Sequence, residues 1–410
     1  GMPGMLPTLN KECVHQAVKT GLGLNAVINK YSAFSRKNYF YADLPQGYQI
    51  TQFQYPIVGE GKVTIDLEDG TTKDIGIERM HIEQDAGKSI HDLDPKKTFI
   101  DLNRAGVGLM EIVTKPDFRS PEEAGAFLKK LRSILRYLGT CDGNMDEGSM
   151  RCDVNVSVRP YGSDELRCRC EMKNVNSVKF VMQAIENEAK RHVEVYEAGG
   201  TIEQETRKFD PLTGKTGLLR KKEYAHDYRY FPEPDLVPVV ISDEWMEEIR
   251  SRQPELRDEK LERYKREYNI PDYDAEIITG NKHLADLFEE TTALCNLPKK
   301  VSNWLMGETM RLMKEEDLEP EKLTFSPENL AKLIQLTESR AINNSVAKEV
   351  FEKIFREDID PEQYVEENGL KTVADDGALR TTIEKIVADN PQSVEDYRSG
   401  KKKAIGFLVG

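Results

Sequence analysis

The apolar residues change their spacing near Ser242, and this change constrains the fold more than any other feature of the chain. Before it, short alternating runs such as 63–67 and 154–158 end in turn residues, a pattern typical of half-buried strands. After it, apolar residues recur every three or four positions, as in amphipathic helices. Prolines within 232–238 form a rigid exit from the first region. We therefore predict an α+β fold in which a strand-rich region precedes a helical one.

Two helices are expected inside the strand-rich region. The first begins after Ser120, with a proline at its first position and a capping-box glutamate, and ends at Gly139. The second runs from Ser177 to about Ala198. Further helices are predicted at 244–252, 258–268, 284–294, 301–314, 326–336, 346–355, between 360 and 369, and from Ser393. A second boundary near Glu319 gives three domains, 1–241, 242–320 and 321–410.

The bulk composition excludes several classes of protein. A length of 410 residues suits two or three soluble domains. No apolar stretch approaches a membrane span, and the six cysteines form no spaced framework, so we expect a reducing cytoplasm. The net charge of −14 argues against a DNA-coating protein but leaves room for a local RNA-binding patch. The run Lys401, Lys402 and Lys403 is a candidate, although a short lysine run is more often a solvated helix face.

The segment 83–89 combines carboxylates with a glycine and a lysine. If a strand ends here, Glu83 and Asp85 point to one face, where two carboxylates repel unless a cation or a basic side chain lies between them. Mg²⁺ is held by such carboxylates together with phosphate oxygens. Gly87 would allow a ligand close to the backbone, and Lys88 can neutralise phosphate. The alternative is a solvated acidic turn, and the chain has no Walker A loop.

A second segment, 101–113, strengthens the cation-site interpretation. Glu111 stands in the apolar run 109–113, where a buried carboxylate requires a metal or a basic partner. The alternative is a side chain that faces solvent. Asn103 and Arg104 offer a planar set of donors suited to phosphate or carboxylate.

Further polar clusters occur throughout the first 240 residues, and structural hydrogen bonding explains any one of them. Together they favour a large open binding surface. These clusters are 36–41, 145–155, 171–177, 204–207 and 226–231. The histidines form no spaced metal set among themselves, and Cys168 and Cys170 are too close for a zinc knuckle. There is no Gly-x-Ser-x-Gly elbow, so serine-type hydrolysis is unsupported.

At these motifs the chain resembles the GatB family, one of the subunit types of the glutamyl-tRNA(Gln)/aspartyl-tRNA(Asn) amidotransferases. The matching segments span nearly the whole chain and keep a characteristic order. They are 3–10, 36–41, 48–52, 83–88, 101–104, 109–113, 172–177, 204–207, 227–235, 302–307 and 406–410.

The resemblance implies a cradle-like catalytic domain, a helical domain and a YqeY-like tail that binds tRNA. It implies that ATP phosphorylates the side-chain carboxylate of Glu or Asp mischarged on tRNA(Gln) or tRNA(Asn). Ammonia from a separate amidase (glutaminase) subunit then displaces phosphate, and a small third subunit completes the heterotrimer. Glu83 and Glu111 fall on the family's Mg²⁺ site, and Lys37 falls where the family gates the ammonia path.

The remaining site assignments follow the same clusters. We assign substrate or nucleotide binding to Lys88, Asn103, Arg104, Arg151, Lys173, Asn174 and Arg229, and tRNA binding to Lys401, Lys402 and Lys403. Two interpretations of a different class stay open: a tRNA-binding scaffold without chemistry, and a stand-alone ATP-dependent carboxylate–amine ligase.

The chain also departs from the family pattern. Family members carry a Glu-Val-His strand ahead of the Pro3-Gly4 motif and continue beyond Gly410. We therefore expect a chain truncated at both ends, with the third contributor to the metal site lying upstream of Gly1. Gln84 stands where many members have a second glutamate, which makes Glu83 the safer ligand.

Overall fold

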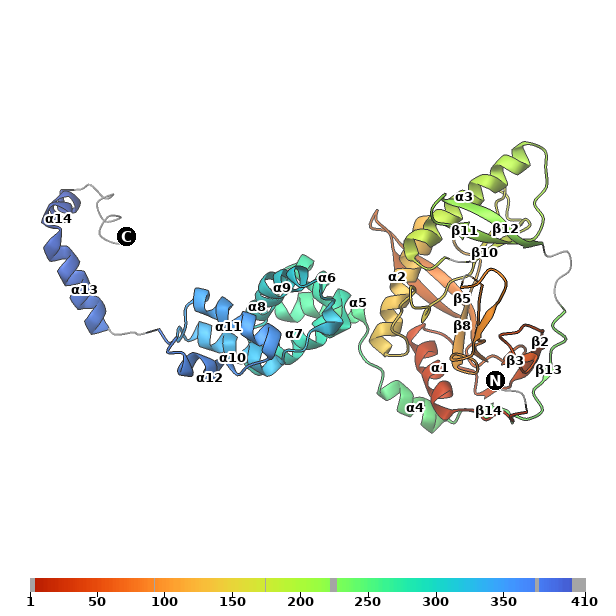
Figure 1. The fold of residues 1–410 in the computed structure, drawn as a ribbon, viewed down its shortest axis with the longest axis horizontal. Helices are drawn as coiled ribbons and strands as arrows, with labels where there is room; N and C mark the ends of the chain where they lie inside the picture. The colour runs from red at the N-terminus through yellow and green to blue at the C-terminus, as the bar shows by residue number, and fades with distance from the viewer. Residues whose placement is uncertain (1–3, 92, 174, 222–226, 373–375, 400–410) are drawn as a thin grey trace. The chain divides into compact units, whose positions relative to one another are not determined.

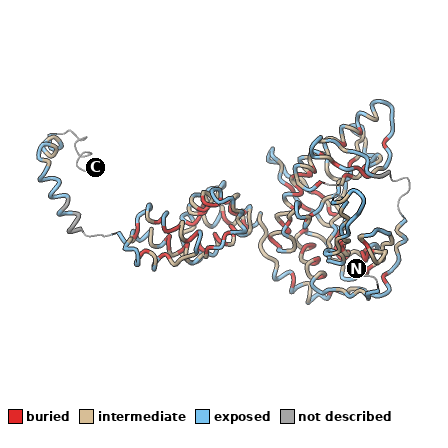
Figure 2. The backbone as a smooth tube through the Cα atoms, in the orientation of Figure 1, coloured by how far each residue is buried: buried red, intermediate tan, exposed pale blue. Residues whose placement is uncertain are grey.

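The computed structural model describes residues 4–91, 93–173, 175–221, 227–372 and 376–399, and it is α+β, as predicted (Figure 1). The chain divides into two compact units, Gly1–Arg263 and Tyr264–Gly410. The predicted domain boundaries after residues 241 and 320 stay predictions. Each unit has its own buried interior (Figure 2). Among the described residues, no helix is both long and apolar enough to span a membrane.

The first unit is built around an antiparallel sheet in which β5 (Thr72–Gln84) lies between β4 (Gly61–Asp66) and β8 (Gly108–Thr114). Burial alternates along β4, as the period-two pattern predicts. Ile65 and Ile75 are fully buried. Burying each such side chain stabilises the fold by about 1.5–3 kcal/mol.

Two helices pack on this sheet. The predicted helix α2 (Pro121–Leu138) is confirmed: the Ser120 hydroxyl accepts the Glu123 amide at 3.2 Å, and Gly139 closes the helix with a φ of 70°. Helix α1 (Lys11–Gly23) contacts β5 and was not predicted. Glycines at positions 21 and 23 interrupt the apolar spacing in the last turn of α1, which hides its helical period.

Several short strands complete the part of the unit that surrounds the candidate site. Strand β2 (Ser35–Asn38) lies between β3 (Tyr48–Thr51) and β13 (Phe231–Pro232), and β3 contacts β5. The two remaining pairs are β1 (Tyr31–Ser32) with β14 (Val239–Val240) and β6 (Lys88–Ile90) with β7 (Phe99–Asp101).

A second sheet of this unit has the order β12-β11-β10-β9 and carries helix α3 (Figure 1). Helix α3 (Val178–Glu197) begins at the Ser177 N-cap, as predicted. The strands are β9 (Val154–Val156), β10 (Cys170–Lys173), β11 (Glu205–Asp210) and β12 (Lys215–Lys221), and helices α4 (Asp243–Ser251) and α5 (Arg257–Arg263) end the unit. Strand β9 stops two residues before the predicted end of the alternating run.

The second unit is helical, as the spacing of apolar residues predicts. Phe288 and Phe351 lie fully buried in it. The last predicted helix begins two residues early, at Pro391 after Asn390, because a proline suits the first helical turn. Its described elements are η1 (Tyr264–Tyr268), α6 (Asp272–Gly280), α7 (Lys282–Cys295), α8 (Pro298–Trp304), η2 (Leu305–Thr309), α9 (Met310–Glu315), η3 (Pro320–Lys322), α10 (Pro327–Glu338), α11 (Asn344–Glu357), α12 (Pro361–Glu367), α13 (Asp376–Asp389) and α14 (Pro391–Arg398).

Candidate functional site

An imidazole and two carboxylates meet where β5 pairs with β8. His81 stands directly opposite Glu111, and Glu83 follows two residues later on the same strand face. His81 Nε2 lies 3.4 Å from Glu83 Oε2 and 3.8 Å from Glu111 Oε2. The three possible ligand atoms lie within 4.8 Å of one another. We call these three residues the acidic cluster.

The acidic cluster brings together the two carboxylates that the sequence singled out. Its third member is His81, which the sequence did not single out as a ligand; the further contributor expected upstream of Gly1 stays a prediction. A search for paired histidines overlooks His81, because its partners are carboxylates. Glu111 is not buried as its apolar strand suggested. Its side chain is 48% exposed, which matches the solvent-facing alternative.

Glu83 is buried and surrounded by compensating groups. The Thr51 hydroxyl donates to Glu83 Oε2 at 3.0 Å. Burial alone would raise the pKa of the Glu83 carboxyl, but the hydrogen bond and charge of His81, the charge of Lys37 and the hydrogen bond from Thr51 together lower it. Glu83 is therefore a carboxylate at neutral pH.

Lys37 is held on β2 between two aromatic rings. Its Nζ lies 4.8 Å from the centroid of the Tyr228 ring and 5.6 Å from that of Tyr39. Such contacts restrain an ammonium without neutralising it. Burial is the main cause that raises the pKa of the Tyr39 phenol, which donates to Gln49 Oε1 at 2.9 Å. The phenol stays protonated beside the acidic cluster.

Two predicted arginines meet at one carboxylate. Asp85 is buried and accepts Arg151 Nη2 at 2.8 Å and Arg104 Nη2 at 3.1 Å. The two guanidinium side chains remain about half exposed. Arg104 also donates to the Gly148 carbonyl at 3.0 Å. The carboxylate of Asp85 is thus compensated by two basic side chains, one of the two ways in which the sequence allows its charge to be offset.

The structure does not bring the other assigned residues into these groups. Lys88 is exposed on β6, and Asn103 donates to Asp101 within its own turn. Lys173 pairs with Asp153 at 2.6 Å on the second sheet. Arg229 is exposed, with a φ of 46°.

Gly87 lies close to the protein's own backbone. A Cβ at this position would come within 2.7 Å of the Asp101 carbonyl oxygen, so the close neighbour of Gly87 is not the ligand that was expected. The other predicted positions, Asn174, Lys401, Lys402 and Lys403, lie outside the described residues.

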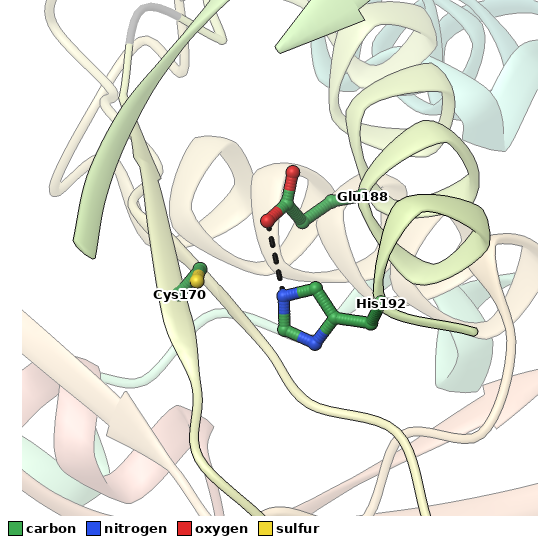
Figure 3. A group of neighbouring side chains, drawn as sticks. All are labelled: Cys170, Glu188 and His192. Atoms are coloured by element: carbon green, nitrogen blue, oxygen red, sulfur yellow. Dashed lines mark hydrogen bonds and ion pairs between the residues drawn. The ribbon is translucent and has the colours of Figure 1, made fainter. Parts of the chain in front are cut away.

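A second trio of potential ligands, which was not predicted from the sequence, lies between α3 and the second sheet. Figure 3 shows Glu188 and His192 on α3 pointing toward Cys170 on β10. His192 Nε2 lies 3.0 Å from Glu188 Oε1, and all three residues are buried. We call this trio the buried cluster.

Arginines already occupy the carboxylate of the buried cluster. Glu188 accepts Arg191 at 2.6 Å, Arg207 Nε at 3.3 Å and the Thr216 hydroxyl at 2.5 Å. Arg207 also pairs with Glu205 at 2.6 Å. Burial would raise the pKa of Glu188, but its hydrogen bonds to His192, Arg191 and Thr216 hold that pKa far below the ordinary value.

The chain matches two family models. One, described as the GatB/GatE catalytic domain, covers residues 1–247, and one described as the GatB domain covers residues 286–410.

Similar curated proteins are the B subunits of the aspartyl/glutamyl-tRNA(Asn/Gln) amidotransferases of three bacteria. That of Agathobacter rectalis is 56% identical over 410 residues, covering 100% of this chain and 86% of the relative. Those of Rhodospirillum rubrum and Gluconobacter oxydans are 54% and 55% identical, each covering 100% of this chain and 84% of the relative. The chain therefore belongs to the GatB family of tRNA-dependent amidotransferase subunits.

Proposed function

We propose that this chain activates the side-chain carboxylate of Glu or Asp mischarged on tRNA(Gln) or tRNA(Asn), using ATP and Mg²⁺, and then amidates it with ammonia. The names of its relatives supply the substrate class, because each relative is part of an aspartyl/glutamyl-tRNA(Asn/Gln) amidotransferase. The acidic cluster supplies the chemical argument. It is the observation on which the proposal rests.

The residues of the acidic cluster suit a hard divalent cation. Glu83 and Glu111 bring two negative charges within 4.8 Å, a costly arrangement unless a cation lies between them. His81 Nδ1 is buried and has no hydrogen-bond partner among the described residues, so the ring is not fully satisfied by the protein. Glu83 and Glu111 would hold Mg²⁺, with His81 as third ligand or as a donor to Glu83. The ion would offset charge on the phosphates during phosphoryl transfer.

Lys37 and its aromatic neighbours would act on the carboxylate substrate and on the incoming ammonia. The ammonium, fixed over Tyr228 and close enough to influence Glu83, can orient a carboxylate substrate or block passage of a small neutral molecule. Protonated phenols such as Tyr39 donate hydrogen bonds without adding charge. These features support, for Lys37, the gating role that the family resemblance implies.

The proposal includes partners and a cellular setting. The relatives are named as one lettered subunit of an amidotransferase, which implies further subunits. We propose that an amidase subunit supplies the ammonia and that a small third subunit joins the two larger ones. All six cysteines are free, which suits the reducing cytoplasm, where translation takes place.

The test is Glu111→Gln in the reconstituted complex. We expect ATP-dependent formation of Gln-tRNA(Gln) to fall by roughly 10²-fold or more, because one of two charges that hold the cation is lost. Calorimetry should show weaker binding of Mg²⁺ with an ATP analogue, whereas binding of mischarged tRNA should be unchanged. Since Glu111 is half exposed, the variant should fold normally.

Glu78→Gln is the matched control, because Glu78 is an exposed glutamate of the same sheet, on the neighbouring strand β5, and lies outside the acidic cluster. Wild-type turnover in Glu111→Gln would remove the cation site from the proposal. A wild-type complex that binds mischarged tRNA but no Mg²⁺-nucleotide would favour the scaffold alternative. Equal activity of the isolated chain with ammonium would favour a stand-alone ligase.

A further inference from the structure

Asp85 combines a buried carboxylate with two exposed cations. Asp85 is only 5% exposed, yet the side chains of Arg104 and Arg151 are 45% and 53% exposed. The carboxylate accepts Arg104 through one oxygen, at 3.1 and 3.2 Å, and Arg151 through the other, at 2.8 Å. Asp85 therefore fixes both guanidinium groups, while their half-exposed side chains leave further N–H donors accessible to solvent.

Asp85 and Arg104 also connect three separate segments of the chain. The Asp85 amide donates to the Val107 carbonyl at 2.8 Å, and the Asp85 carbonyl accepts the Gly106 amide at 2.9 Å. Arg104 reaches across to the Gly148 carbonyl at 3.0 Å. The backbone of Asp85 thus ties the end of β5 to the turn before β8, and Arg104, held by the Asp85 carboxylate, ties that turn to the loop after α2. Such a frame keeps both guanidinium groups in fixed orientations.

The charges of this group do not balance. Two arginines share one aspartate, and in the part of the chain that the structure describes Arg151 has no second carboxylate partner. The surplus positive charge faces solvent and suits an anion with several acceptor oxygens. Guanidinium donors match phosphate bidentately, which a lysine does not.

The group also lies next to the acidic cluster. Asp85 follows Glu83 by two residues, a rise of about 7 Å along a strand. Gln84 pairs with Gly108 at the end of the same two strands that carry His81 and Glu111. A phosphorylated ligand whose cation sits at the acidic cluster could extend its other phosphates toward the arginines.

We propose that Asp85 is a positioning residue that holds Arg104 and Arg151 as a clamp for a phosphate group. This arginine clamp rests on the proposed function for the source of its ligand. The phosphate belongs either to the nucleotide or to the acceptor end of the tRNA, and both offer the same chemistry to the guanidinium groups.

Direct binding to the reconstituted complex tests the clamp without requiring turnover. The variants are Asp85→Asn, Arg104→Gln and Arg151→Gln. One arm titrates Mg²⁺ with adenosine 5′-(β,γ-imido)triphosphate by calorimetry, and the other measures Glu-tRNA(Gln) by filter binding. We expect Kd in one arm to rise about tenfold in each arginine variant, and Asp85→Asn to reproduce most of this rise although it removes neither guanidinium. The arm that responds identifies the phosphate.

Controls separate the clamp from folding and from the proposed function. Arg250→Gln removes an arginine of similar exposure, 56%, that pairs with one carboxylate, and should leave both Kd values unchanged. If Asp85→Asn does not fold, the half-exposed arginine variants still decide the question. Kd values within twofold of wild type in both arms for both arginine variants would overturn the clamp. A wild-type complex that binds no nucleotide would instead overturn the proposed function, while the tRNA arm would still test the clamp.

Discussion

The acidic cluster and the buried cluster contain similar residues but differ in charge. Each has a histidine in contact with a glutamate, and each could place three ligand atoms around an ion. In the buried cluster, Arg191 and Arg207 balance Glu188 and Glu205. In the acidic cluster, two carboxylates face one imidazole, and Lys37 acts only from a distance.

The difference shows that a set of ligand types does not by itself make a metal site. The carboxylate of the buried cluster already accepts arginine, histidine and threonine donors, so a cation would have to displace them. The acidic cluster keeps an unbalanced negative charge and a half-exposed glutamate that a cation can reach. The number of fixed counter-charges therefore supports the cation site proposed for the acidic cluster and a role in fold stability for the buried cluster.

The largest expected difference between the two clusters appears when one glutamate of each, Glu188 or Glu111, is replaced by leucine. Glu188→Leu should lower the free energy of unfolding of the first unit by about 3–5 kcal/mol, because Arg191 and Arg207 lose a buried partner. Glu111→Leu should change it by less than about 0.5 kcal/mol, or raise it slightly, since it relieves repulsion with Glu83.

Urea unfolding in a Trp304→Phe background measures this effect. The chain has two tryptophans, so Trp245, which lies in the first unit, then reports on that unit alone. Equal losses of stability in the two leucine variants would show that the acidic cluster is also a structural ion-pair network.

A smaller effect should appear in the pH dependence of stability. Native Glu188 holds its pKa far below the unfolded value of about 4.3, so the unfolded chain binds the proton first as the pH falls. The stabilisation from Glu188 is complete above that value and is lost below it, at up to about 1.4 kcal/mol per pH unit. Urea midpoints between pH 6 and pH 3 should therefore fall less steeply in Glu188→Gln. Identical slopes in variant and wild type would mean that Glu188 carries no such coupling.

The sequence predicted the parts of the fold that depend on local pattern. Ser120 and Gly139 bound α2 as expected, because capping acts within one helical turn. It also singled out Glu83, through its spacing from Asp85, and Glu111, because a carboxylate in an apolar run is unusual.

The remainder of the site depends on pairing between distant segments. The register of β5 and β8 brings His81 opposite Glu111, and nothing local to either segment determines it. The partners of Asp85 lie 19 and 66 residues along the chain. Glu188, Arg191 and His192 lie at helical spacing on the predicted helix α3, so this part of the buried cluster could be read locally, but Arg207 and Thr216 come from two strands far along the chain.

The smallest expected effect comes from Cys170→Ala in the buried cluster. This variant tests whether Cys170 is a packed thiol or a metal ligand. Burial first, and then the charge of Glu188, raise the pKa of the Cys170 thiol to about 11, so it remains protonated at neutral pH. A zinc ligand would have to be a thiolate.

Cys170→Ala should lower the free energy of unfolding by about 1 kcal/mol and leave the zinc content of the purified chain at background by elemental analysis. Iodoacetamide at pH 8 should modify the less buried Cys168 well before Cys170. Stoichiometric zinc that is lost in Cys170→Ala would show that a cation displaces the arginines from Glu188, and the distinction between the two clusters would then fail.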